Sequence, residues 1–226
     1  MNCDYCRERE GIETIYNKIY GNRNRVVYET KNFCVFPCIG QLREGHLLVA
    51  SKEHVNAIGM LRPNVIVELE QISKTIAAFF KKQYNQELLC FEHGVLSDEG
   101  MNGGCGIYHM HLHLLPASYI EFSDVLRQVK IPDTNTVQLV QGFTETCHFV
   151  AEGKTYIFLG HSDKYQNFKS YVISNSNNYF ESQYMRKIIC NVFQKSNWDW
   201  RQVIQEEPEF LNTLGKSRAF FLETTP

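Results

Sequence analysis

The sequence contains no long hydrophobic run, no Lys/Arg-rich run and no export signal. No window approaches the roughly 18 consecutive apolar residues that would span a bilayer, and the start, Met1-Asn2-Cys3-Asp4, lacks the basic and apolar regions of a signal peptide. Because the net charge is only −2, long-range attraction to a nucleic-acid backbone is a poor expectation. We therefore predict a soluble, cytoplasmic protein with neither a membrane nor nucleic acid among its partners.

The composition and length also exclude an intrinsically disordered protein and a small protein that depends on disulfide bonds. Its 226 residues are 43% hydrophobic and 21% charged, which are ordinary globular values, and a chain of this length buries a core without covalent staples. Without an export signal, the eight cysteines are predicted to be reduced thiols, some of them bound to metal. Cys3 and Cys6 have the C-x-x-C spacing that lets two sulfurs bind one metal.

The first half alternates short β-rich segments with one long amphipathic helix. The helix is predicted to begin at Pro63 and to end before Gln86, because apolar residues recur there at steps of three and four. The predicted strands are 26–28, 33–36, 46–50 and a strand that begins at 88–91, with a turn at 29–32 that joins the first two.

Three histidines follow a glycine-rich loop at 100–106. In a strand from 107 to 116, period-2 alternation places His109, His111 and His113 on one face. Each buried imidazole needs a hydrogen-bond partner and costs more than a Val or Ile there, so a functional site is favoured over a structural cluster. The simplest metal site combines Cys3 and Cys6 with two histidines. It would be a closed, structural zinc site that leaves the other imidazoles for chemistry.

The sequence from His109 to Leu115 resembles the His-φ-His-φ-His-φ-φ motif of the histidine-triad (HIT) superfamily of nucleotidyl hydrolases and transferases. Upstream, Gly45-His46-Leu47-Leu48-Val49 and Lys52-Glu53-His54 resemble the G-H-x-L-V-x-P-K-x-H segment of that superfamily, with Ser51 in place of the proline. Together with the C-x-x-C and the Gly103-Gly104 loop, these features occur in family order over residues 3–116. The chain is therefore identified as similar to the zinc-containing branch of this superfamily.

The resemblance implies an α+β fold, with an antiparallel sheet and a long helix, and a nucleotide or nucleotide-conjugate substrate. It also implies the roles of the histidines. His111 would be the nucleophile, which carries a covalent nucleotidyl group, and His113 would help to hold the phosphate. The implied ligands of a structural zinc are Cys3, Cys6, His54 and His109.

Backbone amides and two further residues complete the predicted substrate site. The amides of Gly103, Gly104 and Gly106 can cradle phosphate oxygens, although glycines also form ordinary turns. Glu92 and His93 can supply acid or base function at the pocket, and the alternative for His93 is a buried histidine capped by its own loop.

The chain also departs from the family pattern. Gly104-Cys105-Gly106 stands where many members have Gly-Gln-Ser, so assistance to the leaving group must come from elsewhere. Cys38 and Asp98 replace an aspartate and an asparagine that support the nucleoside site in many members.

Residues 117–226 are predicted to be a C-terminal α+β extension packed on a catalytic half at 1–116. Predicted strands at 146–150, 156–159 and 171–173 and a helix from 181 to 192 parallel the element order of residues 26–82 without a second triad. This is the pattern of a degenerate second half, similar to galactose-1-phosphate uridylyltransferase and diadenosine tetraphosphate phosphorylase. A second half in place of a partner subunit predicts a monomer rather than a homodimer.

Two segments of the second half carry arginines. The structural interpretation of Trp198-Asp199-Trp200-Arg201 is a core Trp pair with a local ion pair between Asp199 and Arg201. The functional interpretation places Arg186 or Arg201 on a substrate phosphate, because a planar guanidinium binds two oxygens at once.

Three functions remain open from the sequence. The favoured one is a nucleotide hydrolase, or a transferase, that acts on a phosphoanhydride or phosphoester through His111. The second is nucleotidyl transfer to phosphate or a sugar phosphate. The third is a nucleotide-binding protein with a vestigial site.

Overall fold

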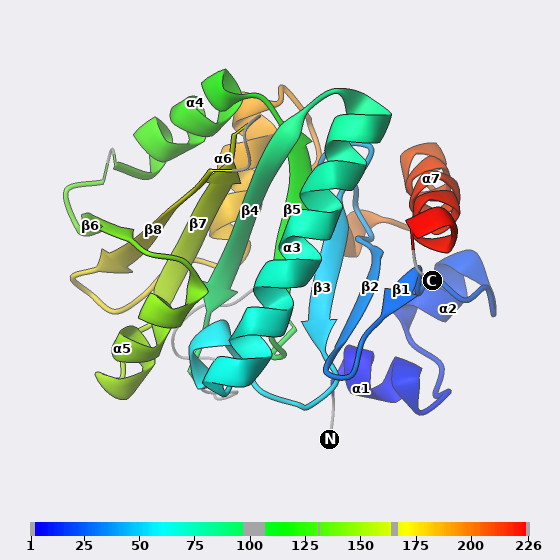
Figure 1. Cartoon of the computed structure of the whole chain (residues 1–226), viewed down its shortest axis with the longest axis horizontal. Coiled ribbons are helices and arrows are strands. Elements are labelled where there is room, and N and C mark those ends of the chain that lie inside the picture. Colours follow the sequence, from blue (N-terminus) through cyan, green and yellow to red (C-terminus); the bar gives the residue numbers. More distant parts are fainter. Residues whose placement is uncertain (1–2, 97–106, 131, 164–166, 225–226) are drawn as a thin grey trace.

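The computed structural model describes residues 3–96, 107–130, 132–163 and 167–224 (Figure 1). The elements of the first half are α1 (Asp4–Arg9), α2 (Ile15–Tyr20), β1 (Tyr28–Glu29), β2 (Phe33–Pro37), β3 (Leu47–Ser51), the 3-10 turn η1 (Ile58–Met60), α3 (Pro63–Tyr84), β4 (Glu87–Gly94) and β5 (His111–Ala117). Those that follow are α4 (Tyr119–Lys130), β6 (Asn135–Val140), η2 (Phe143–Glu145), α5 (Thr146–Ala151), β7 (Tyr156–Ser162), β8 (Phe168–Asn175), α6 (Tyr184–Val192), η3 (Trp200–Gln202) and α7 (Pro208–Thr224).

The strands of both halves form one antiparallel sheet. Within the described residues it has eight strands in the order β1-β2-β3-β5-β4-β7-β8-β6. The halves join at β4 and β7, where Leu88 lies opposite Ser162 and Gly94 lies opposite Tyr156. The protein therefore has the predicted α+β fold with an antiparallel sheet and a long helix, and the sheet continues across the junction.

The predicted long helix is confirmed as α3. Pro63 stands in its first turn, where a missing N–H costs nothing, and Asn85 ends the helix in the left-handed conformation. The apolar stripe from Val65 to Phe80 is buried against one face of the sheet, so α3 crosses that face in Figure 1. Because α3 covers this face, alternate side chains of β4 and β5 point toward α3 and the others point to the opposite face.

Alternation along β4 and β5 separates two cores. Leu88, Cys90 and Leu114 face α3, whereas Leu89 and Leu115 face the opposite side, where α4 and α6 pack. His113 lies directly opposite Phe91 on β4 and so shares this second face. The strand β5 begins at His111 rather than at the predicted residue 107, so His111 and His113 point away from α3 while His109 precedes the strand.

The strand order has a mirror relation about the β4–β7 junction. The first half runs β3, α3, β4, β5 along the chain and β3-β5-β4 across the sheet. The second half runs β6, α5, β7, β8 along the chain and β6-β8-β7 across the sheet. These two units correspond in order and direction, with the short α5 in the place of α3.

Two sequence predictions for the second half are wrong. Residues 146–150 form the helix α5 rather than a strand, so the predicted parallel with residues 26–82 fails. A run of five β-prone residues fits a strand or a buried helical turn equally well, and contacts decide between them. Here the Thr146 hydroxyl donates to the Phe143 carbonyl, and α5 packs on η1. The predicted strands 156–159 and 171–173 are confirmed as β7 and β8.

Among the described residues, no helix is both long and apolar enough to cross a membrane. The cysteines of this part of the chain are free thiols.

Candidate functional site

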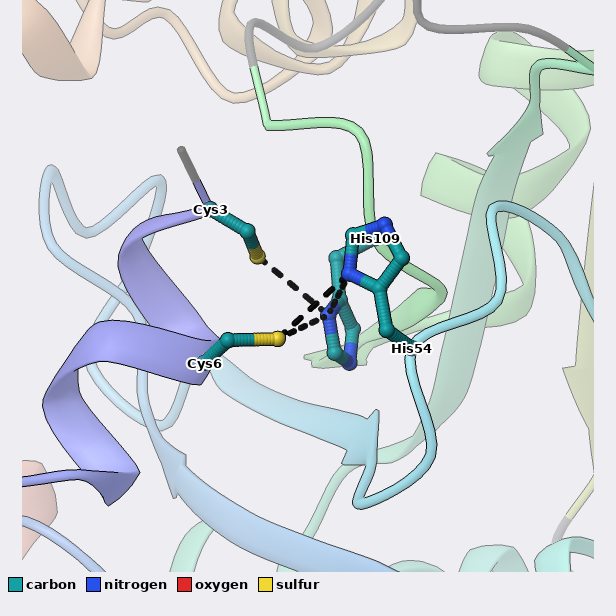
Figure 2. A group of neighbouring side chains, drawn as sticks. All are labelled: Cys3, Cys6, His54 and His109. Carbon is teal, nitrogen blue, oxygen red and sulfur yellow. Dashed lines mark hydrogen bonds between the residues drawn. The ribbon is translucent and has the colours of Figure 1, made fainter. Parts of the chain in front are cut away.

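Two cysteines and two histidines from distant parts of the chain meet beside α1 (Figure 2). The Cys3 Sγ lies 3.3 Å from the His109 Nδ1, and the Cys6 Sγ lies 3.4 Å from the His54 Nδ1. The two Nδ1 atoms are 3.1 Å apart, and the four ligand atoms lie within 4.8 Å of one another. The structure thus brings together the four residues that the sequence resemblance implied as zinc ligands.

The donor set and its spacing fit a tetrahedral zinc ion. Zn–S bonds of about 2.3 Å and Zn–N bonds of about 2.0–2.1 Å place neighbouring ligand atoms roughly 3.3–3.8 Å apart. The His109 Nε2 lies 2.7 Å from the Ser51 carbonyl oxygen, to which it donates, so the Nδ1 that faces the sulfurs has a free lone pair. Burial lowers the pKa of His109 to about 4, which keeps the ring neutral, as a metal ligand must be.

His111 has its tautomer fixed by the backbone. Its Nδ1 lies 2.6 Å from the His109 carbonyl oxygen, so Nδ1 carries the proton and donates it. The Nε2 atom then has a lone pair and no hydrogen bond to any described residue. Burial lowers the pKa of His111, which favours the neutral ring. This imidazole is therefore held in the form that attacks an electrophile.

His113 is fixed by a chain of hydrogen bonds. The Leu42 amide donates to the Nδ1 of His46, so the proton of His46 is on Nε2, which lies 2.9 Å from the His113 Nδ1. The proton of His113 is consequently on Nε2, and that buried atom has no partner in the described structure. Burial lowers the pKa of both rings well below the ordinary value, in agreement with two neutral imidazoles. His113 therefore offers an unused N–H donor.

His111 and His113 line a cavity of about 30 Å³ that both halves of the chain enclose. The Tyr5 ring, held by α1, lies 5.6 Å from the ring centroid of His111. Cys38 and Arg186 also line the cavity, and Arg186 comes from α6 of the second half. The loop that closes one side is itself held by the second half, because Glu207 accepts hydrogen bonds from the amides of Gly40 and Gln41.

Cys38, His46 and His113 form a second group of potential metal ligands. A metal ion between them would have to break the hydrogen bond between His46 and His113 and lie close to the guanidinium of Arg186, which is 3.6 Å from the Cys38 Sγ. The arrangement therefore fits a polar network better than a cation site.

His93 and Glu92 point to opposite faces of β4. His93 shares the triad face, where its ring meets Phe180 edge-on, and both of its ring nitrogens are buried without a partner in the described structure. Burial lowers its pKa to about 4, with a smaller contribution from His111. Glu92 instead accepts hydrogen bonds from the Ile58 amide and the Tyr156 hydroxyl, each at 2.8 Å, on the α3 side. The structure therefore does not bring Glu92 to the triad cavity.

Burial raises the pKa of Glu92 to about 8 from its ordinary value of 4.5. Between those values the folded chain holds a proton that the unfolded chain releases. The free energy of unfolding should thus fall with rising pH by up to roughly 1.4 kcal/mol per unit in this window. Glu92→Gln imitates the protonated carboxyl and should remove this slope. Urea unfolding at pH 5, 6.5 and 8 measures it, with Glu70→Gln on α3 as the control that keeps the wild-type slope. An unchanged slope in Glu92→Gln would contradict the assignment.

The remaining predicted residues are only partly described. Gly103, Gly104 and Gly106, together with Asp98 and Cys105, lie outside the described residues. The local ion pair in the Trp-Asp-Trp-Arg segment is confirmed, with 3.5 Å between the Arg201 Nη1 and the Asp199 Oδ1. The predicted core Trp pair is wrong, because both tryptophans are half-buried and lie in different surroundings: Trp198 packs beside α6, and Trp200 lines the triad cavity.

Sequence reasoning did not assign a role to His46 or Tyr5. His46 stood in the Gly-His segment that carried the resemblance, but its partner across the sheet, His113, is visible only in three dimensions. Tyr5 lies between the two cysteines in the sequence, so its position over His111 follows from the packing of α1 beside His54 and His109.

Comparisons with known proteins match part of the chain. The model of the family described as scavenger mRNA decapping enzyme C-term binding matches residues 13–124, a segment that begins after Cys3 and Cys6. The nitrilase and fragile histidine triad fusion protein NitFhit of Caenorhabditis elegans is 25% identical over 103 residues, which make up 45% of this chain and 22% of that protein. The chain thus spans less than a quarter of that relative. The two matches support a relationship to the histidine-triad superfamily.

Solved structures of histidine-triad proteins match about half of the chain. A HIT family protein from Bacillus anthracis is 26% identical and has a TM-score of 0.39, with 52% of this chain and 74% of that chain covered. A Zn-bound histidine triad family protein from Mycobacterium smegmatis is 19% identical and has a TM-score of 0.39, with 53% and 75% covered.

Proposed function

We propose that this protein is a nucleotide hydrolase or nucleotidyltransferase with His111 as its nucleophile. The observation that carries the proposal is the hydrogen bond of 2.6 Å from the His111 Nδ1 to the His109 carbonyl oxygen, which leaves the lone pair on Nε2. A neutral imidazole nitrogen attacks phosphorus well, and imidazole is in turn a good leaving group from the resulting phosphoramidate. The related family model and relative support the same class of activity.

The reaction proceeds in two displacements. The Nε2 lone pair of His111 forms an N–P bond while the P–O bond to the leaving group breaks, and the leaving oxygen keeps that electron pair and takes a proton from solvent. The ring then carries a positive charge, which the His109 carbonyl stabilises through Nδ1–H. An incoming water or hydroxyl acceptor attacks phosphorus, releases its proton to solvent, and the N–P electron pair returns to Nε2. The nucleotide leaves, and His111 is neutral again.

His113 acts on the phosphate oxygens. Its Nε2–H is buried and unused, and its orientation is fixed from behind by His46. A fixed donor costs no reorganisation when negative charge builds up on the phosphate during attack, so it stabilises the transition state. The backbone amides of Gly103, Gly104 and Gly106 remain proposed donors to the same oxygens, and we leave Glu92 out of the substrate site.

Zinc is proposed as a structural ion held by Cys3, Cys6, His54 and His109. With four protein ligands it has no open position, and it supplies a cross-link rather than a Lewis acid. These ligands tie α1 to the segment that leads into β5 at His111, and α1 places Tyr5 against the triad.

Residues 1–116 are proposed as the catalytic half and 117–226 as a degenerate second half that replaces a partner subunit. The mirrored strand order about the β4–β7 junction supports this division. Because β7 covers the edge of β4, we propose that the protein is a monomer. The cytoplasmic location predicted from the sequence stays a prediction.

A trapping experiment tests the proposed function. The protein is mixed with a nucleoside diphosphate, a dinucleoside polyphosphate, a 5′–5′ capped dinucleotide and a nucleotide sugar, quenched in alkali, which preserves phosphoramidates, and mapped by mass spectrometry. We expect a nucleotidyl adduct on His111 with at least one of these substrates, and free nucleotide or an acceptor conjugate as the product. Turnover without an adduct, or an adduct on another residue, would overturn the proposal.

A further inference from the structure

Two arginines of the described structure are almost fully buried, and their surroundings differ. Arg25 is 3% exposed and forms a two-pronged ion pair with Glu8, at 2.8 Å and 2.6 Å. Arg186 is 2% exposed and forms no ion pair with any described residue. Because a buried charge without a counter-charge is costly, an unpaired buried guanidinium indicates an anionic ligand.

The described hydrogen bonds of Arg186 hold its guanidinium on neutral acceptors, and Glu207, which contacts the same loop, accepts from the amides of Gly40 and Gln41 rather than from the guanidinium. Its Nε donates to the Trp198 carbonyl at 2.7 Å, and its Nη2 donates to the Gly40 carbonyl at 2.6 Å. Its Nη1 lies 3.6 Å from the Cys38 Sγ, and burial raises the pKa of that thiol, so the sulfur is neutral. Three of the five N–H groups are used on neutral acceptors, and two remain.

The backbone at Gly40 packs closely against the Arg186 guanidinium. Gly40 has a φ of +69°, and a Cβ there would lie 2.9 Å from the Arg186 Nη2 and 2.8 Å from the Trp200 Cβ. The side chain is therefore held in one position by the backbone of the first half, although it belongs to α6 of the second half.

Arg186 lines the same cavity as His111 and His113. The cavity is thus lined by the guanidinium of Arg186, the unused Nε2–H of His113 and the His111 ring with its Nε2 lone pair. Two carboxylates, Asp4 and Glu8, also line it, and they are paired with Arg7 and Arg25. Donors and a positive charge around a nucleophile are what a phosphate group requires. Each of these observations concerns a different side chain, and all of them point to one small anion.

We propose that Arg186 binds a phosphate group of the nucleotide substrate, so that the second half of the chain completes the catalytic site of the first. This inference rests on the proposed function for the identity of the substrate. A guanidinium presents two N–H groups in one plane to two phosphate oxygens, which an ammonium group cannot do. Arg186 therefore determines specificity for the phosphate, while His111 attacks it.

Calorimetric titration with AMP and adenosine separates phosphate binding from nucleoside binding. Loss of charge-assisted hydrogen bonds should weaken AMP binding to Arg186→Gln by about 10- to 100-fold. Adenosine binding should stay within about twofold of wild type, because adenosine has no phosphate. Arg186→Lys keeps the positive charge but loses the two coplanar N–H groups, so its AMP affinity should lie between those of wild type and Arg186→Gln. The matched control is Arg201→Gln, an exposed arginine of the neighbouring segment, which should bind AMP as wild type does.

A measurement on the wild-type protein covers the case in which Arg186→Gln does not fold. The guanidinium ¹⁵N–H signals of Arg186, assigned by their loss in Arg186→Lys, should shift when AMP or inorganic phosphate is added, and adenosine should leave them in place. Signals that do not respond to either anion would show that Arg186 only tethers the Gly40 and Trp198 carbonyls, and would overturn the inference.

The outcomes distinguish the two proposals. Equal AMP affinity in all variants, together with an adduct on His111, removes the role of Arg186 and leaves the proposed function intact. AMP affinity that depends on Arg186, without any adduct, removes the nucleophile and leaves the anion site. A wild-type protein that binds neither AMP nor inorganic phosphate contradicts the role of Arg186.

Discussion

Replacing His111 with Asn should lower turnover by about 10⁴-fold or more while AMP binding stays within about tenfold, because the residue acts mainly in the transition state and the adduct. Asn is preferred to Ala because its amide N–H₂ can still donate to the His109 carbonyl, which accepts from the His111 Nδ1 in the wild type. Steady-state rates and calorimetric titration with AMP measure the two quantities on the same preparation.

Variants of the two neighbouring triad histidines, His113 and His109, are compared with His111→Asn. His113→Ala should cost less turnover than His111→Asn and should also weaken binding, because it removes a phosphate donor. His109→Ala should mainly lower the melting temperature and the zinc content, because it removes a metal ligand. If the three histidines instead held one catalytic metal, all three variants would lose metal and activity together. Full activity in His111→Asn would end the nucleophile hypothesis.

The double variant Cys3→Ser/Cys6→Ser should lose about one zinc per chain and melt about 6–12 °C lower, which corresponds to roughly 3 kcal/mol for a chain of this size. The reason is that a closed four-ligand site stores folding free energy rather than chemical reactivity. The rate of the chemical step, measured below the melting temperature, should fall far less than in His111→Asn. Elemental analysis and calorimetry give the zinc content and the melting temperature.

Cys147→Ser is the matched control, since Cys147 is a half-buried thiol on α5 outside the cluster. It should keep its zinc and shift the melting temperature only slightly. A wild-type protein without zinc, or zinc unaffected by the double change, would contradict the metal assignment. A second equivalent of zinc that remains bound in the double variant would indicate that Cys38, His46 and His113 bind a metal ion.

Much of the first half could be predicted because its local patterns are long or strongly periodic. Helix α3 spans six turns with one apolar stripe and a proline at its start, and this sequence pattern fits a helix and not a strand. The grouping of Cys3 and Cys6 with His54 and His109 came from a motif, because C-x-x-C and two histidines some 50 and 100 residues away carry no geometric information by themselves. The opposite orientation of Glu92 and His93, in contrast, could have been read from the sequence, since adjacent residues in a strand face opposite sides.

The second half was harder to predict because long-range contacts, rather than local sequence patterns, determine which segments are helices and which strands pair. The segment 146–150 was expected to be a strand from its composition, but its packing against η1 makes it helical. No local pattern shows that β7 pairs with β4, a partner more than 60 residues earlier in the chain. The position of Arg186 in the triad cavity depends on the same pairing, so sequence alone could only name it as one of two candidates.

The pairing of β4 with β7 has a consequence for synthesis of the chain. When β4 leaves the ribosome, both of its edges are unpaired, because β5 and β7 are made later. Pairing with β5 satisfies one edge, and the other stays open until β7 has been made. An open, largely apolar edge can pair with another nascent chain, so edge-to-edge aggregation is favoured during this interval. The triad histidines are made early in synthesis, but their cavity is completed only when Arg186 of α6 and Trp200 have been made, so a prematurely terminated chain would carry the triad without the guanidinium beside it.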